Sequence, residues 1–194
     1  MTGLTGRKAL SHDRIVTAGS RAVRRAGFGG VSVADVMKEA GLTHGGFYAH
    51  FASRDELLAA SVARAGTDMI ASLGAQVARM VQAGVTPFRA LVETYLYEDH
   101  IRDSENGCPV PALCAEAPRQ RQEVGDATRR SIHELHKFVQ QTLPRDVSPD
   151  AAWAIVTSLV GAVQLARAMG TGGSGRAVLA STRAELLARY EPEG

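Results

Sequence analysis

The sequence contains few cysteines, few aromatic residues and no long apolar run. Only two of its 194 residues are cysteine and 5% are aromatic. Cys108 and Cys114 are too few for a disulfide framework, and no secretory leader precedes the first expected helix. The longest uncharged stretch, residues 151–166, is shorter than the roughly 20 apolar residues that cross a bilayer. These absences predict a cytoplasmic protein without a membrane span.

Charge is unevenly distributed, although the net charge is only +2. Residues 1–60 hold eight Lys and Arg against five Asp and Glu, whereas the remainder holds 14 against 15. A weakly basic segment joined to a neutral one fits a small DNA-reading module carried by a second domain. The bias is modest, and many solvated surfaces carry as much.

Apolar residues recur at three- and four-residue steps along most of the chain, and strand-like alternation is almost absent. This spacing predicts an all-α fold of about nine helices. Glycine, proline and capping residues indicate where the helices begin and end. The expected helices cover about residues 12–26, 33–40, 43–50 and 54–81, then a helix from 87, followed by 112–117, 120–143, 150–169 and a last helix ending near 190.

Two short helices joined by a tight turn follow the first long helix. Ser32 can cap the helix over 33–40, Gly41 ends it, and Thr43 stands where the helix over 43–50 needs its N-cap. Such a pair allows the second helix to lie in the major groove of DNA while the first packs across it. The spacing therefore predicts a helix-turn-helix.

The third helix combines apolar anchors with glycine. Phe47 and Phe51 lie four residues apart and are expected to pack in the core, whereas Tyr48 is expected to point outward, where its hydroxyl can meet a phosphate. Gly45 and Gly46 each cost an α-helix roughly 1 kcal/mol relative to alanine. We therefore expect a short or loose recognition helix.

This block resembles the TetR family of bacterial regulators. The resemblance rests on the Gly-Phe pair at 27–28, Ser32, Val36, Ala40-Gly41, the run Phe47-Tyr48-x-His50-Phe51 and the run Ser53-Arg54-Asp55-x-Leu57-Leu58. It implies a helix-turn-helix domain over residues 1–53 and a helical effector-binding and dimerisation domain over 54–194. The implied DNA-binding residues are Tyr48, His50 and Arg54 at phosphates, Thr43, His44 and Gly45 nearest the bases, and Ser32 at a helix start.

A homodimer is expected from the last two long helices. The stretch 151–166 is apolar on nearly all sides, and one protomer can cover only part of such a helix. A two-fold dimer sets two recognition helices about 34 Å or a multiple apart, which predicts a palindromic operator. Closure of a monomeric core is the alternative. The expected interface residues are Trp153, Val156, Leu159, Val160, Val163, Leu186 and Tyr190.

The resemblance also implies a small-molecule cavity among the middle helices. Its candidate residues share an inward position and a polar or polarizable atom. For some of them, including His136 and Trp153, an ordinary core position is the alternative. The candidates are Met69, Tyr95, Asp99, Cys114, His136, Trp153 and Gln164.

The sequence predicts a DNA-binding transcriptional regulator, a repressor released from its operator by a small-molecule effector. The alternative is a regulator that senses oxidants or electrophiles through Cys108 or Cys114, with Cys108 expected to be accessible in a polar break. An enzyme is not expected, because no nucleophile elbow and no Glu-x-x-His pair on facing helices is present. No cofactor and no metal site is expected, although Cys108 and Cys114 with His133 and His136 could form one.

Overall fold

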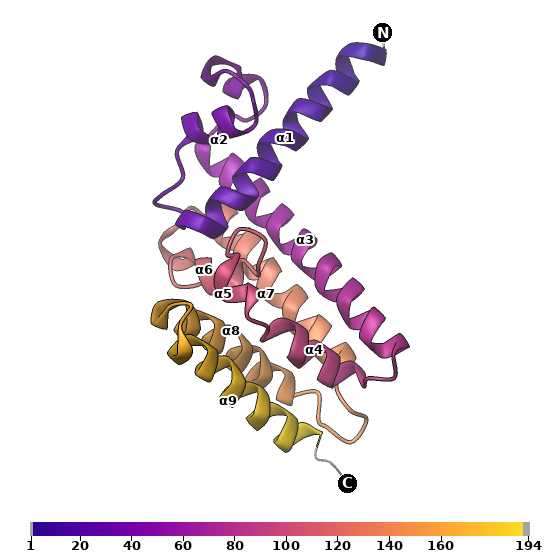
Figure 1. The fold of residues 1–194 in the computed structure, drawn as a ribbon. Coiled ribbons are helices and arrows are strands. Elements are labelled where there is room, and N and C mark those ends of the chain that lie inside the picture. Colours follow the sequence, from indigo (N-terminus) through magenta and orange to yellow (C-terminus); the bar gives the residue numbers. More distant parts are fainter. Residues whose placement is uncertain (1, 192–194) are drawn as a thin grey trace. The chain divides into compact units, whose positions relative to one another are not determined.

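The computed structural model describes residues 2–191, with side chains from residue 6 onward. Within these residues every regular element is helical, which confirms the all-α prediction (Figure 1). The elements are α1 (Thr2–Ala26), α2 (Val33–Glu39), the 3-10 helix η1 (His44–Ala49), α3 (Arg54–Gln82), α4 (Pro87–Tyr95), α5 (Asp99–Arg102), α6 (Val110–Leu113), the 3-10 helix η2 (Ala117–Arg119), α7 (Gln122–Thr142), α8 (Ala151–Met169) and α9 (Gly173–Tyr190).

Local side-chain caps set the starts of α2 and α3. The Ser32 hydroxyl accepts a hydrogen bond from the Asp35 amide at 3.4 Å, as expected for an N-cap. At α3, the Ser53 hydroxyl accepts from the Glu56 amide at 3.0 Å, and the Glu56 carboxylate accepts from the Ala52 amide at 2.6 Å. These bonds occupy amides that have no partner within the helix. The expected starts of both helices are confirmed.

The helix α1 begins at Thr2, well before the start expected near residue 12. Residues 6–10 are all exposed, whereas Ile15 is fully buried. An apolar stripe marks only the part of a helix that packs against something. The spacing therefore detected the packed part of α1 and missed its exposed extension.

The chain forms two compact units, and each is described by itself. Unit 1 comprises the residues up to Thr67 together with Cys108–Ser131, and unit 2 comprises Asp68–Gly107 and the residues from Ile132 onward. This division differs from the domain boundary expected at residue 53. The reason is that Leu113, from a later part of the chain, packs in the same hydrophobic cluster as α1 to α3.

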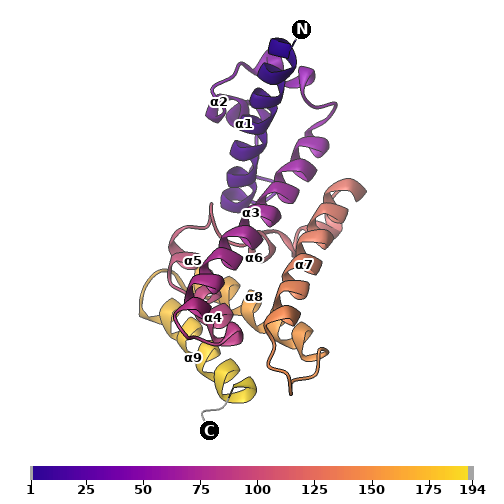
Figure 2. The same ribbon diagram turned by 90° about the vertical axis from the view of Figure 1, so that its right-hand side faces the viewer.

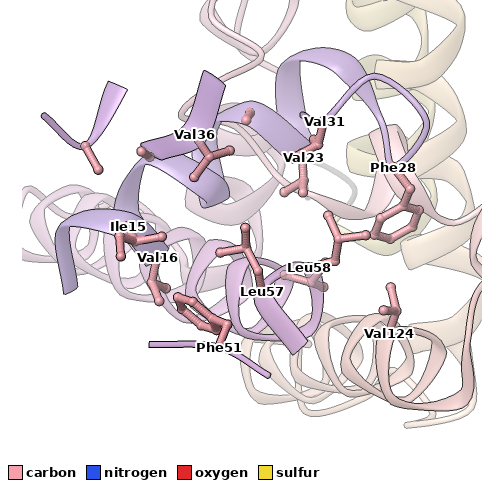
Figure 3. Packing of buried hydrophobic residues seen from close by; sticks show 14 of the residues in the cluster. Ile15, Val16, Val23, Phe28, Val31, Val36, Phe51, Leu57, Leu58 and Val124 are labelled. Atoms are coloured by element: carbon pink, nitrogen blue, oxygen red, sulfur yellow. The ribbon is translucent and has the colours of Figure 1, made fainter. Parts of the chain in front are cut away.

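The core of unit 1 is a cluster of buried apolar side chains from six helices. Figure 3 shows part of it, with Ile15 and Val36 beside the side chains of α3 and with Val124 contributed by α7. Small residues allow close helix approach: a Cβ atom at Gly66 would lie 2.5 Å from the Ser131 hydroxyl. Interdigitated packing of this kind holds the helix-turn-helix on a rigid support.

Unit 2 is built around α8 and α9, which lie side by side (Figures 1 and 2). The helix α4 packs against α9, where the rings of Phe88 and Tyr190 meet edge to face at 5.9 Å. The Arg183 guanidinium donates a hydrogen bond to the Leu96 carbonyl at 3.0 Å. These contacts fix the C-terminal helix against the middle of the chain.

Candidate DNA interface and effector cavity

The turn between α2 and η1 depends on Gly41. This residue has φ +67°, a conformation that residues with a Cβ atom rarely adopt. The Leu42 amide donates to the Met37 carbonyl and the Gly41 amide to the Lys38 carbonyl, both at 2.9 Å. This pair of bonds is the Schellman arrangement that ends a helix abruptly. The chain can therefore reverse from α2 into η1 within four residues.

The recognition element η1 is a 3-10 helix rather than the expected α-helix. The Gly46 amide bonds to the Thr43 carbonyl at 3.1 Å, which is an i to i+3 bond. Two glycines weaken the α-helix, and short runs then adopt the tighter 3-10 form. The Thr43 side chain occupies the N-cap position but makes no cap hydrogen bond, contrary to expectation. The predicted short helix is confirmed.

Two phenylalanines anchor η1 in the core. Phe47 and Phe51 are 3% and 2% exposed, and their rings stack with centroids 5.7 Å apart. Figure 3 shows the Phe51 ring among the apolar side chains of unit 1. Their predicted role in the core is confirmed.

The outer side of η1 consists of residues expected to contact DNA. Thr43, His44 and Gly45 are exposed, and Tyr48 is 75% exposed, so the prediction that Tyr48 points outward is confirmed. The Tyr48 ring rests edge to face against Phe47 at 5.1 Å. A tyrosine that is braced by a buried ring but open to solvent can present its hydroxyl to a phosphate. The DNA contacts of these residues remain predictions.

His50 lies beside two α1 residues that the sequence analysis did not single out. The rings of His12 and His50 have centroids 6.3 Å apart, and the His12 ring stacks on Phe51 at 4.8 Å. The pKa of His50 is lowered from its ordinary value because burial desolvates the imidazolium and because His12 and Lys8 repel it. An anion placed here would relieve this repulsion. Lys8 and His12 are four residues apart and so share one face of α1, which is the only sequence signal that could have indicated that they lie together.

Arg54 makes hydrogen bonds inside unit 1. Its Nη2 atom donates to the carbonyls of Phe28 and Val31 at 2.5 and 3.1 Å, and its Nε atom donates to Val31 at 3.3 Å. These bonds fasten the loop between α1 and α2 to the start of α3. These bonds use the Nε and Nη2 atoms, so the Nη1 atom can still donate to a phosphate, and the structure adds a positioning role that the sequence did not indicate.

Glu116 holds the same loop from another part of the chain. Its carboxylate accepts a hydrogen bond from the Phe28 amide at 3.1 Å. A Cβ atom on Gly27, which has φ +68°, would overlap this carboxylate. Because Gly27 has no side chain, the Glu116 carboxylate can occupy the space beside it. Nothing local in the sequence indicates a contact between residues 88 positions apart.

Unit 2 contains a cavity of about 200 Å³. Three of the seven expected effector residues, Met69, Tyr95 and Asp99, line it. They come from α3, α4 and α5, so the structure brings together residues far apart in the sequence. The full lining is Met69, Ser72, Leu73, Gln76, Thr94, Tyr95, Tyr97, Asp99, His100, Asp103, Asn106 and Gly107.

The other four expected effector residues do not line this cavity. Cys114 belongs to unit 1. His136 stacks on Trp153 with ring centroids 4.0 Å apart, and Trp153 is 45% exposed. Gln164 is exposed on α8. Helical periodicity reveals neither which helix covers an inward residue nor which side of a helix stays exposed, which is why the sequence could not exclude these four residues.

His100 lines the cavity and has a lowered pKa. Its Nδ1 atom lies 2.5 Å from the Tyr95 carbonyl oxygen, so the N–H is on Nδ1 and donates to that carbonyl. Burial lowers the pKa by desolvating the imidazolium, and Arg167 adds repulsion. The Tyr95 carbonyl and Asp99 favour the charged form, but they do not outweigh these effects. His100 therefore contributes a neutral ring to the cavity at pH 7.

We expect His100 to make the protein less stable in mild acid. The unfolded chain takes up a proton near the ordinary pKa of about 6.5, whereas the folded state resists protonation. The contribution of neutral His100 to the free energy of unfolding is therefore fully present above that pH, and it is lost as the pH drops toward the lowered pKa. His100→Asn, whose amide can still donate to the Tyr95 carbonyl, should flatten this dependence in urea unfolding between pH 7.5 and 5.5. The exposed His133, replaced by Asn, serves as the control, and equal pH slopes for His100→Asn and the unmodified protein would contradict the assignment.

The two cysteines differ in exposure. Cys108 is fully buried and Cys114 is partly exposed. The expectation that Cys108 is accessible is wrong, because the whole segment 107–111 is buried. Within residues 2–191, no group of three or more His, Cys, Asp and Glu could hold a metal ion.

The helix α8 has a buried side and an exposed side. Val156, Leu159, Val163 and Leu186 of α9 were expected at a dimer interface, but they are buried within the protomer and form its own core. The face that remains open to a second copy therefore consists mostly of other residues, with Trp153 and Val160 in common. The exposed and half-buried residues of α8 include Trp153, Ala154, Thr157, Val160, Gly161, Gln164, Leu165, Ala168 and Met169.

The helix α9 presents small residues on an exposed side. They recur at three- and four-residue steps and therefore share one face of the helix. Small side chains allow the backbone of a neighbouring helix to come close. The residues are Ala177, Ser181, Ala184 and Ala188, and Tyr190 is half-buried at the end of the helix.

Among the described helices, α8 is the one long and apolar enough to cross a membrane by length and composition. Its inner side packs in the protomer. A core helix of a soluble protein passes the same test, so this property alone is weak evidence for a membrane span.

Comparison with known proteins shows a family resemblance in the first part of the chain. Residues 15–61 match the bacterial regulatory proteins of the tetR family. No curated protein matches the chain significantly. The region matched covers α2 and η1, which is the part of the chain that carries the helix-turn-helix.

Solved structures share the fold over nearly the whole chain. A TetR-family regulator from Cytophaga hutchinsonii has a TM-score of 0.78 at 18% identity and covers 97% of this chain and 98% of its own. One from Chloroflexus aurantiacus has a TM-score of 0.74 at 21% identity and covers 93% of each chain. The reduced form of NemR from E. coli has a TM-score of 0.73 at 18% identity and covers 91% of this chain and 94% of its own. The part of the chain that carries the helix-turn-helix is therefore similar to the tetR family of bacterial regulatory proteins, and the fold is shared with solved regulators of that family.

Proposed function

We propose that this regulator is a homodimeric repressor that binds a palindromic operator and is released by a small-molecule effector. The observation that carries the proposal is the surface of η1, where Thr43, His44, Gly45 and Tyr48 are open to solvent while Phe47 is buried. An element anchored by one side and exposed on the other suits insertion into the major groove.

Phosphate contacts are proposed at the edge of this surface. Tyr48, His50 and Arg54 are the residues implied by the family pattern, and Lys8 and His12 of α1 lie close enough to His50 to join them. Ser32 caps α2, and both its hydroxyl and the backbone amides at this helix start can donate hydrogen bonds to a phosphate. Contacts of this kind position the protein on the duplex, whereas sequence reading falls to His44 and the backbone at Gly45.

The homodimer is proposed to form through the exposed sides of α8 and α9. Trp153, Leu165 and Met169 are large apolar side chains on the open face of α8. The same face carries Thr157 and Gln164, which fit a protein neighbour better than lipid. A second copy covering this face would explain the apolar character of α8 in a cytoplasmic protein. Two-fold pairing then requires a palindromic operator.

The effector is proposed to bind the cavity of unit 2. Gly107 lines this cavity and is followed directly in the chain by the buried segment that leads to Glu116. Glu116 in turn binds the loop that precedes α2 through the Phe28 amide. A ligand that shifts the segment after Gly107 can therefore affect the support of the helix-turn-helix. Such coupling requires that this segment has two arrangements and that the ligand binds one of them more tightly than the other.

We expect Tyr48→Phe to weaken binding to every DNA sequence by about tenfold, because it removes one hydrogen bond to a charged phosphate. His44→Ala is expected to change sequence preference instead. Fluorescence anisotropy with a fragment of the protein's own promoter and with random DNA, at several salt concentrations, measures both effects. If the protein contacts phosphates, its affinity for DNA must fall steeply as the salt concentration rises.

The control for these variants is Gln141→Ala, which removes an exposed polar group in unit 2 and should leave DNA binding unchanged. Equal losses on specific and random DNA for both Tyr48→Phe and His44→Ala would refute the assignment of sequence reading to His44. Affinity that is insensitive to salt would refute the DNA-binding function itself.

A thiol switch is the less supported alternative. Cys108 is buried, so this alternative depends on the partly exposed Cys114. The likeness to NemR, solved in a reduced form, extends to the fold alone.

A further inference from the structure

The charge of the cavity in unit 2 is one-sided. Asp99 and Asp103 line it, and its lining contains no lysine or arginine. His100 adds a neutral ring, because its pKa is lowered. The cavity therefore presents carboxylates to a ligand without a lining cation to balance them.

Asp99 is the carboxylate best placed to receive a positive charge. Within the described residues no lysine or arginine forms an ion pair with it, whereas the preceding Glu98 pairs with Arg102 and Arg176 at 3.0 and 3.9 Å. The Asp103 carboxylate is engaged by the amide groups of Asn106 at 3.2 and 2.8 Å.

Arg167 is a cation that lies close to the cavity lining. Its Nε atom donates to the His100 carbonyl at 2.9 Å, and it is not part of the cavity lining. It contributes to keeping His100 neutral by repulsion. A ligand in the cavity meets Asp99 directly, whereas the Arg167 guanidinium lies behind Gly107, with its Nη2 atom 2.9 Å from where a Cβ atom on that glycine would stand.

The remaining walls of the cavity are apolar or aromatic. Met69 and Leu73 are buried side chains of α3, and Tyr95 is fully buried in α4. Tyr97 is 58% exposed and lies at the open part of the lining. Aromatic faces attract cations, and this attraction adds to a carboxylate counter-ion. The volume of about 200 Å³ is below the range typical of pockets for drug-sized ligands.

We propose that the effector cavity takes a small organic cation, an amine or quaternary ammonium with an aromatic or compact apolar body, with Asp99 as its counter-ion. This inference rests on the proposed function, since it names the chemical class of the effector. The apolar body packs on Met69 and Leu73, and the charged group lies between Asp99 and the tyrosines.

Isothermal titration with three probes of one size tests the proposal. The probes are 2-phenylethylammonium, the neutral 2-phenylethanol and the anionic 3-phenylpropanoate. The cation should bind tightest, and Asp99→Asn should weaken it about tenfold while leaving the neutral probe unchanged. Asp146→Asn, which removes an exposed carboxylate elsewhere in unit 2, is the matched control and should bind the cation like the unmodified protein. Thermal unfolding of each variant checks that the fold is retained.

The outcomes separate the ligand class from the regulatory function. Tighter binding of the neutral or anionic probe, equal binding of the cation to Asp99→Asn, or no binding of any probe overturns the cationic assignment. DNA binding is measured on the same samples by anisotropy. Asp99-dependent binding of the cation without release of DNA supports the assignment and overturns ligand-relieved repression, and absence of salt-dependent DNA binding overturns the regulator proposal by itself.

Discussion

Replacing Phe47 by alanine is expected to lower the free energy of unfolding by about 3–5 kcal/mol and to abolish DNA binding. Phe47 is 3% exposed and stacks on Phe51, so its removal leaves a cavity in the core of unit 1. A loss of this size is a large share of the roughly 5–15 kcal/mol that stabilises a typical domain.

Phe47→Ala should impair DNA binding by more than the loss of folded protein alone explains. The helix η1 is a short 3-10 turn without a side-chain cap at Thr43 and with two glycines. Its position therefore depends on the Phe47 anchor more than on its own helical propensity. Even in molecules that stay folded, η1 would lose the support that aims it outward.

Urea unfolding and fluorescence anisotropy distinguish these two effects. Tyr48→Ala is the matched control, because it removes the adjacent ring, which is 75% exposed. It should change stability by no more than about 0.5 kcal/mol and should still impair DNA binding. If Phe47→Ala is no less stable than Tyr48→Ala, η1 is not anchored as the structure shows.

Replacing Ala184 by arginine is expected to turn the proposed dimer into monomers and to reduce operator affinity by about 10²-fold or more. Ala184 lies on the exposed small-residue face of α9. A long charged side chain there would separate the two copies and leave a charge without a partner in the interface. A monomer engages one half-site and forfeits the gain from binding two at once.

Sedimentation at micromolar concentration measures the change in assembly. Ala71→Arg adds the same side chain to an exposed position on α3 in unit 2 and serves as the control. It should remain dimeric and keep its affinity for the operator. A dimeric Ala184→Arg would place the interface elsewhere, and an unmodified protein that sediments as a monomer would favour the monomeric alternative.

Much of the DNA-binding surface could be predicted from short-range patterns. The cap at Ser32, the turn at Gly41 and the inward Phe47 with the outward Tyr48 depend on residues within five positions of one another. Backbone hydrogen bonding and helical periodicity act over that distance, so the sequence carries the signal directly. The positioning roles of Arg54 and Glu116 lacked such a signal, because their partners lie 23 to 88 positions away.

The amino-acid sequence by itself determined the helical fold class, the helix-turn-helix and the two aromatic anchors of its recognition element. Tertiary structure alone decided which inward residues meet in the cavity, that Cys108 is buried and which side of α8 stays open. The physical reason is that a helix's periodicity indicates that one of its sides is covered. What covers it depends on contacts between distant segments, which only the packing of the whole chain establishes.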